Sequence, residues 1–139
     1  MVLADSSAWI VSRRPDGARA RQVLDSLVST DEIAICDMVR FELAYSARNA
    51  GEMAAALAML AVPYDCPIGK GQWQRALTVY RRLAEQGGAH HRSVGYPDLL
   101  IAAPAQAARA PVLHYHQDFH RIAAITGQPT QWILPRGSL

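Results

Sequence analysis

The chain has little lysine and little cysteine. Of its 14 basic residues, 13 are arginine and only Lys70 is a lysine. The formal net charge of +2 is too small to indicate nucleic-acid binding by itself, although guanidinium groups suit phosphate well. Cys36 and Cys66 stand apart, without CxxC or Cys/His metal spacing, so we expect a reduced, cytoplasmic protein.

Long hydrophobic runs are also absent. The richest apolar runs, AAALAMLAV and LLIAAPAQAA, are far shorter than the roughly 20 residues that a transmembrane helix needs. The start, MVLADSSAW, lacks the basic residues of a signal peptide and carries an aspartate. The sequence therefore predicts no membrane association.

Short apolar runs alternate with longer segments of helical spacing, which predicts an α/β fold. The strand candidates are MVLA, EIAIC, AVPY, PVLHY and QWIL. They are apolar throughout instead of alternating, which is typical of a parallel sheet covered on both faces. With 139 residues, half of them apolar, we expect one domain spanning 1–139. Ligand sites in such folds form beyond the carboxyl ends of the strands.

Helical segments are expected between these strands. One follows the loop RRPDGA, and DMVRFELAYSARNAG should form the next, with Asp37 at its N-cap and Gly51 past its end. EMAAALAML should then pack antiparallel to it. A long helix in IGKGQWQRALTVYRRLAEQGG carries one apolar stripe, made of Trp73, Leu77, Tyr80 and Leu83. A further helix begins at Pro97, and Pro104 is expected to kink or shorten it.

Two carboxylates stand where a structural role explains them poorly. Asp5 directly follows the first strand and could cap the next helix. Ser6 and Ser7 can serve as caps too, which leaves Asp5 free to face the carboxyl edge of the sheet. Glu42 shares a largely apolar helix face with the residues three and four positions away. Glutamate is seldom buried without a partner, so the alternatives are a functional role and an ion pair with a distant arginine.

Two further aspartates stand at expected helix starts. The helix dipole alone would favour Asp98 in the first turn of its apolar helix, and Asp118 is a natural N-cap before FHRIAAI. With Asp5 and Glu42, however, they occupy positions that parallel α/β topology can gather at one sheet edge. Clustered carboxylates repel one another unless a cation lies among them. Oxygen ligands from Asp and Glu select Mg²⁺ or Mn²⁺ over zinc.

Four segments resemble a known family. LADSSAWI, VRFELAYSAR, HRSVGYPDLLIAA and VLHYHQDFHRIAAITGQPTQWI are similar to those of PIN-domain ribonucleases, specifically the VapC toxins of type II toxin–antitoxin pairs. Their order, spacing and context carry the resemblance, which covers nearly the whole chain. It implies a PIN-like three-layer α/β/α sandwich with a central parallel sheet and an acidic site that depends on Mg²⁺ or Mn²⁺.

The resemblance also implies which residues act. The catalytic acids carried onto this chain are Asp5, Glu42, Asp98 and Asp118. We expect Asp5 and Asp98 to bind the metal directly, while the other two either bind it as well or orient water. Ser7 matches the small hydroxyl residue that steadies the first aspartate. The family's last acidic segment commonly reads H-Y-D-x-D-F, so His116 replaces an acid and removes a negative charge near a second metal.

The implied reaction is metal-dependent hydrolysis of RNA phosphodiester bonds. Because an acidic pocket repels phosphate, nearby arginines must help to reverse the local field. Arg13, Arg14 and Arg92 are the RNA-binding candidates, although surface solvation explains such arginines equally simply. The resemblance further implies a cognate VapB-like antitoxin, whose C-terminal segment covers the acidic groove, and a homodimer. Exposed apolar surface on the helix pair 37–61 would suit either partner.

Other functions stay open at this point. His116 could weaken metal binding enough to leave a PIN-like module that only binds RNA or an antitoxin. A zinc site at His114, His116 and His120 is disfavoured, because we expect His114 to be structural and His120 to be a solvated helix position. A phosphoaspartate hydrolase would need a D-x-D pair after the first strand, and ADSSAW supplies one aspartate.

Overall fold

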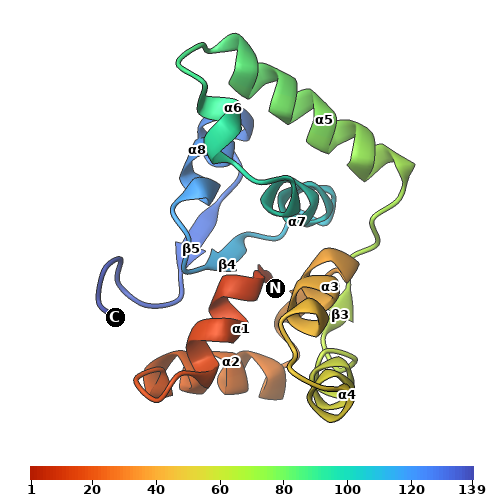
Figure 1. The fold of residues 1–139 in the computed structure, drawn as a ribbon, viewed down its shortest axis with the longest axis vertical. Coiled ribbons are helices and arrows are strands. Elements are labelled where there is room, and N and C mark those ends of the chain that lie inside the picture. Colours follow the sequence, from red (N-terminus) through yellow and green to blue (C-terminus); the bar gives the residue numbers. More distant parts are fainter.

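The computed structural model contains a five-stranded, all-parallel sheet with the strand order β3-β2-β1-β4-β5 (Figure 1). The structure describes the backbone of residues 1–139 and every side chain except that of His90. The order reverses at β1, where Leu3 pairs with Ala34 of β2 and with Val112 of β4. The strands are β1 Val2–Ala4, β2 Ile33–Ile35, β3 Tyr64–Asp65, β4 Val112–His114 and β5 Thr130–Trp132. All five predicted strands are therefore confirmed.

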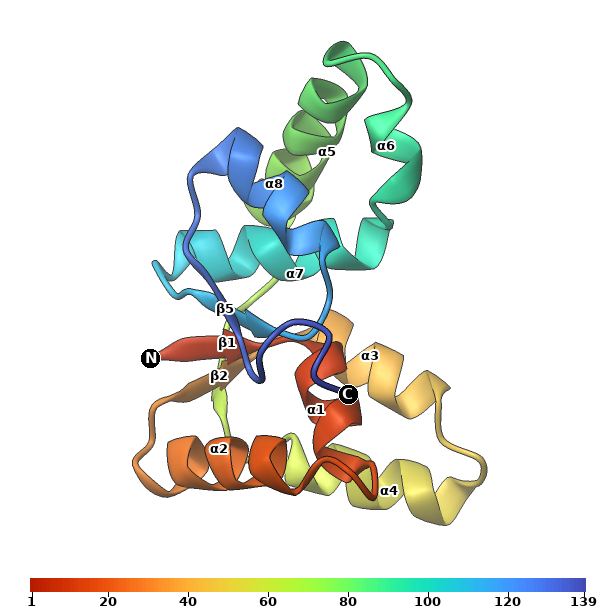
Figure 2. The same ribbon diagram turned by 90° about the vertical axis from the view of Figure 1, so that its left-hand side faces the viewer.

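Helices cover both faces of the sheet, which confirms the predicted three-layer α/β/α sandwich. In Figure 2, α5, α6, α7 and α8 lie on one side of the sheet, and α1, α2 and α4 lie on the other. The helix bounds are α1 Ser6–Arg13, α2 Ala18–Ser29, α3 Asp37–Tyr45, α4 Ala50–Met59, α5 Lys70–Glu85, α6 His90–Ser93, α7 Tyr96–Ala107 and α8 Asp118–Thr126. In the described part of the chain, every helix is too short or too polar to cross a lipid bilayer.

The boundary between α3 and α4 differs from the prediction. α3 ends at Tyr45, and Gly51 lies inside the first turn of α4 instead of past the end of α3. The cause is Asn49, whose side-chain oxygen accepts a hydrogen bond from the Glu52 N–H at 2.9 Å and so starts a new helix. Asp37 is the first residue of α3 and not its cap.

α5 buries a different face from the one predicted. Of the expected stripe, Leu83 is buried, whereas Trp73 and Leu77 are 53% and 62% exposed. The residues of α5 that reach the core are Ala76, Val79 and Leu83. Alanine and valine let α5 pack closely on α7, so the larger side chains lie at the edge of that contact.

α7 contains two prolines, and the structure agrees with the prediction for only one of them. Pro97 lies in the first turn, as predicted, where the missing N–H has no intrahelical partner to lose. Pro104 does not end the helix, which continues to Ala107. The expected shortening is wrong because residues 99–105 are all buried, and this packing outweighs a proline cost of about 3 kcal/mol.

Candidate functional site

The carboxylate of Asp5 lies at the carboxyl end of β1, next to the point where the strand order reverses. The residue is 1% exposed, and its Oδ2 accepts hydrogen bonds from the Ser7 N–H at 2.9 Å and the Ser7 hydroxyl at 2.5 Å. Asp5 therefore caps α1 itself, contrary to the expectation that Ser6 or Ser7 would do so. Among the described residues, no group donates to its buried Oδ1. Burial raises the pKa of Asp5 above its usual value.

Ser7 connects two segments of the site. Besides donating to Asp5, its Oγ accepts a hydrogen bond from the Tyr115 N–H at 2.8 Å. This contact ties the start of α1 to the loop that follows β4. The sequence placed Ser7 beside Asp5, but the link to Tyr115 depends on the pairing of β1 with β4 and was not visible in the sequence.

Glu42 reaches the site from α3. Its Oε1 accepts a 2.8 Å hydrogen bond from the Ser6 hydroxyl on α1. Burial raises the pKa of Glu42, and the negative charge of Asp5 raises it further, while the Ser6 hydrogen bond lowers it. The alternative of an ion pair is not supported, because Arg40 and Arg48 bind other carboxylates and no described arginine contacts Glu42.

Asp98, His116 and Asp118 form a compact cluster. His116 lies between the two acids, with Nδ1 3.2 Å from Asp98 Oδ2 and Nε2 3.7 Å from Asp118 Oδ2. One ligand atom from each residue lies within 4.8 Å of the others, a spacing that suits a shared metal ion. Burial, followed by the negative charge of Asp5, raises the pKa of Asp98 to about 7. Glu42 and Asp118 also raise it and His116 lowers it, so Asp98 lies within electrostatic reach of the other three acids.

His114 lies behind this cluster in an aromatic environment. It is fully buried, with its ring centroid 5.1 Å from Phe119 and 4.8 Å from Trp132. Its Nδ1 accepts a 3.1 Å hydrogen bond from the His116 N–H, and burial lowers its pKa to about 4. His114 is thus structural, as predicted. His120 is an exposed position on α8, as predicted, and its Nε2 also accepts a 2.8 Å hydrogen bond from the Trp132 N–H.

Comparison with known proteins identifies the family. The model of the PIN domain family matches residues 2–125. Ribonuclease VapC18 of Mycobacterium tuberculosis is 45% identical over 97% of this chain and 96% of its own length. Ribonuclease VapC51 of the same species is 35% identical over 93% of this chain and 92% of its own. The chain belongs to the VapC family of PIN-domain ribonucleases.

Solved VapC structures share the fold. The VapBC2 complex of Rickettsia felis, bound to a DNA fragment from its promoter, superposes with a TM-score of 0.74. The match has 19% identity and covers 95% of this chain and 99% of the solved chain. At this identity the similarity concerns the fold alone, and it agrees with the all-parallel sheet covered by helices.

Arg13 and Arg14 are neighbours at the end of α1, whereas Arg92 of this VapC-family chain lies on α6. Arg14 pairs with Asp16 at 3.0 Å. Arg13 lines a groove of about 450 Å³ between α1, α3 and α4. Arg92 lines another groove, of about 520 Å³, between α5, α6 and α7. The structure therefore does not gather the arginines at one phosphate-binding surface.

The sequence reasoning missed Ser6 as a functional residue. Ser6 is buried, and its hydroxyl binds a carboxylate that comes from another helix. The available signal was the pair of adjacent hydroxyl residues after Asp5, since one of them is enough to hold that aspartate. Only the packing of α1 against α3 shows what the other one contacts.

Proposed function

We propose that this VapC-family chain is a toxin that hydrolyses RNA phosphodiester bonds at a metal site built on Asp5, Glu42, Asp98 and Asp118. The observation that carries the proposal is the cluster of Asp98, His116 and Asp118, whose ligand atoms lie within 4.8 Å of one another. Burial first, and then the negative charge of Asp5, raises the pKa of Asp98, and buried carboxylates so close together fit a site that is completed by a cation.

The donor atoms fit Mg²⁺ or Mn²⁺. Asp5 Oδ1 is buried and has no hydrogen-bond partner in the described structure, so it is available to a metal. Asp98 and Asp118 present carboxylate oxygens within the 4.8 Å cluster. We assign Asp5 and Asp98 as direct ligands and Glu42 and Asp118 as further ligands or water-orienting groups. A bound metal would make water more acidic and offset the negative charge that develops on the phosphate oxygens.

The chain's own residues orient the reacting groups. Ser7 holds Oδ2 of Asp5 through two hydrogen bonds, and Oδ1 takes no part in them. Ser6 fixes Oε1 of Glu42, so the second oxygen, Oε2, is free to accept a hydrogen bond from the attacking water. Because burial raises the pKa of Glu42, this carboxylate is a better proton acceptor than an exposed glutamate.

His116 is relevant to the alternative function, in which the protein binds RNA or an antitoxin but does not cut RNA. Its Nδ1 lies 3.2 Å from Asp98 Oδ2 and its Nε2 3.7 Å from Asp118 Oδ2, although the side chain is half exposed to solvent. We propose that His116 supplies a nitrogen ligand where similar toxins carry a carboxylate. A site with this substitution loses one negative charge but keeps a donor atom, which favours a nuclease over the binding module.

We further propose two protein partners, a cognate VapB-like antitoxin and a second copy of the chain. The antitoxin is supported by the similarity to VapC chains solved in VapBC complexes. The helix pair α3–α4 exposes Phe41 and Tyr45 on α3, and Met53 and Leu57 on α4. Large exposed apolar side chains gathered in this way are typical of protein-binding surfaces.

The function is tested with the purified chain, free of antitoxin. It should cut RNA when Mg²⁺ or Mn²⁺ is present and stop when the metal is chelated, and Asp5→Asn should abolish cutting. Cleavage without a metal, or full activity of Asp5→Asn, would contradict the assignment. In cells, induced expression should arrest growth, and co-expression of the protein encoded by the adjacent small gene should relieve the arrest.

A further inference from the structure

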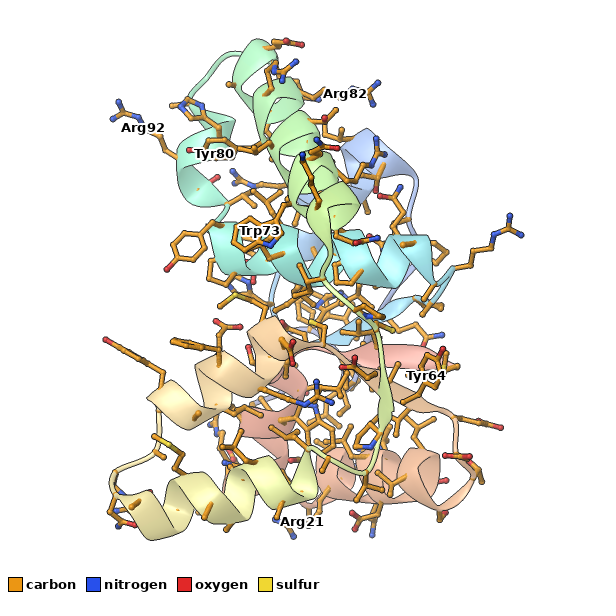
Figure 3. All side chains as sticks on the ribbon, turned by 90° about the vertical axis from the view of Figure 1, so that its right-hand side faces the viewer. Arg21, Tyr64, Trp73, Tyr80, Arg82 and Arg92 are labelled. Atoms are coloured by element: carbon orange, nitrogen blue, oxygen red, sulfur yellow. The ribbon has the colours of Figure 1, made fainter. Side chains whose placement is uncertain are left out.

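The groove between α5, α6 and α7 has a composition of its own. Trp73 and Tyr80 line it from α5, and Tyr96 lines it from the start of α7, with aliphatic side chains between them. Trp73, Tyr80 and Arg92 lie on the same side of α5, whereas Arg82 lies on the other side (Figure 3). The groove thus offers several aromatic rings and one guanidinium group to a ligand.

His91 also lines this groove and carries a buried polar atom without a partner in the part of the chain that the structure describes. Its ring makes an edge contact with Tyr80, with centroids 5.7 Å apart and an interplanar angle of 77°. Its Nδ1 is buried and has no hydrogen-bond partner among the described residues. A buried ring nitrogen without a partner is costly, so a ligand that supplies a hydrogen bond is favoured over a purely apolar one.

We propose that this groove binds an unpaired nucleobase of the RNA substrate, next to the bond that is cut. The proposal rests on the proposed nuclease function and assigns a subsite to it. Unpaired bases stack on aromatic side chains and form hydrogen bonds through their edges, which Trp73, Tyr80, Tyr96 and His91 can provide. Arg92 at the exposed rim would bind an adjacent phosphate. A volume of about 520 Å³ suits a small organic group.

The position and the charge of this groove favour RNA over a purely apolar ligand or a second copy of the chain. Tyr96 and Leu99 line the groove, and Asp98 lies between them on α7, so the groove and the acidic site share the first turn of one helix. The residues that line the groove include no carboxylate, unlike the neighbouring site. A nucleic-acid chain that enters the acidic site can therefore continue into this groove without further repulsion.

The test uses a stem–loop RNA library with a randomised loop, cut by the full chain with Mn²⁺ and sequenced at the cut ends. Trp73→Leu and His91→Ala should lose the base preference at one position near the cut. The same variants should raise KM by about 10-fold, as expected when base stacking is removed. Arg92→Gln should raise KM without changing the base preference, because Arg92 is assigned to a phosphate. Tyr64→Leu and Arg82→Gln are matched controls for Trp73→Leu and Arg92→Gln, because both lie away from the groove (Figure 3). The controls should leave preference and KM unchanged.

The possible failures are distinguishable. Unchanged base preference and KM in Trp73→Leu and His91→Ala would overturn the groove assignment and leave the nuclease intact. If Trp73→Leu also converts a dimer to a monomer by light scattering, the groove is a contact between two copies. If the wild-type chain cuts no RNA, the nuclease proposal fails. The groove assignment is then tested by tryptophan fluorescence with a single-stranded oligoribonucleotide. Quenching in the wild type that is lost in Trp73→Leu supports it, and equal quenching in both, or none in the wild type, overturns it.

Discussion

Ser6 Oγ donates a 2.8 Å hydrogen bond to Glu42 Oε1 and so joins two residues that are 36 positions apart. The bond connects the first turn of α1 with the middle of α3. It holds a half-buried carboxylate whose pKa burial raises, and it counteracts part of that rise. Ser6 is therefore a positioning residue, because it acts on the site through Glu42.

Replacing Ser6 tests this relationship. Ser6→Ala should lower kcat about 10-fold, which corresponds to a rise of about 1.4 kcal/mol in the activation free energy. The acid limb of the pH–rate profile should move to higher pH, because the pKa of Glu42 rises when the hydrogen bond is lost. Ser6→Thr keeps the hydroxyl and should behave like the wild type. A purely structural serine would lower Tm in Ser6→Ala without moving the pH profile.

Asp98 should destabilise the metal-free protein at neutral and higher pH. Its pKa is about 7 in the folded chain and 3.8 for an ordinary aspartate, so the folded state binds more protons between these values. Stability should thus fall as pH rises through this window, by up to about 4 kcal/mol at about 1.4 kcal/mol per pKa unit. In EDTA, urea unfolding should find Asp98→Asn more stable than the wild type at pH 8. Near pH 4 the difference should be small; an equal difference at both pH values would contradict the prediction.

His114 should act in the opposite direction within the same pH range. Its pKa is about 4 in the folded chain and 6.5 for an ordinary histidine, so the unfolded state binds more protons between these values. The stability of the wild type relative to His114→Asn should fall by up to about 3 kcal/mol as pH drops from 7 to 4. Asparagine is chosen because its side-chain oxygen can still accept the hydrogen bond from the His116 N–H. A pH-independent difference would show that His114 is accessible to protons in the folded state.

His116→Asp should change the metal preference. The substitution restores a carboxylate between Asp98 and Asp118, where the ring nitrogens lie 3.2 and 3.7 Å from the two acids. Mg²⁺ prefers oxygen donors, whereas imidazole suits transition ions better, so Mg²⁺ should bind more tightly and the preference for Mn²⁺ should decrease. Calorimetric titration and the Tm shift with each ion would measure this. Unchanged binding of both ions would place His116 outside the metal site.

The sequence was sufficient to predict the sheet and the acids. Apolar strands that do not alternate indicate a sheet covered on both faces, and each predicted run overlaps an observed strand, although AVPY shares only Tyr64 with β3. Asp98 and Asp118 were ambiguous individually, since each stands at a helix start where any aspartate is favourable. Their significance came from combining them with Asp5 and Glu42 at one sheet edge, and the pKa of Asp98 reflects that proximity.

Three features of the structure depend on tertiary contacts and could not be predicted from the sequence. The apolar stripe on α5 has two available faces, and the choice of Val79 over Leu77 for the core depends on how closely α7 approaches. The hydrogen bond from Ser6 to Glu42 requires α1 and α3 to be adjacent. The position of His116 between two acids depends on the loop after β4, which periodicity does not describe.

The aromatic support of the site also has a consequence for the order of folding. Trp132 of β5 packs on His114, and His114 in turn accepts the hydrogen bond from the His116 backbone. Asp5 follows β1, whereas the support for the loop beside it comes from β5, which pairs with β4 at the edge of the sheet. A folding chain therefore completes the acidic site only once β5 has joined the sheet, however early β1 and β2 pair.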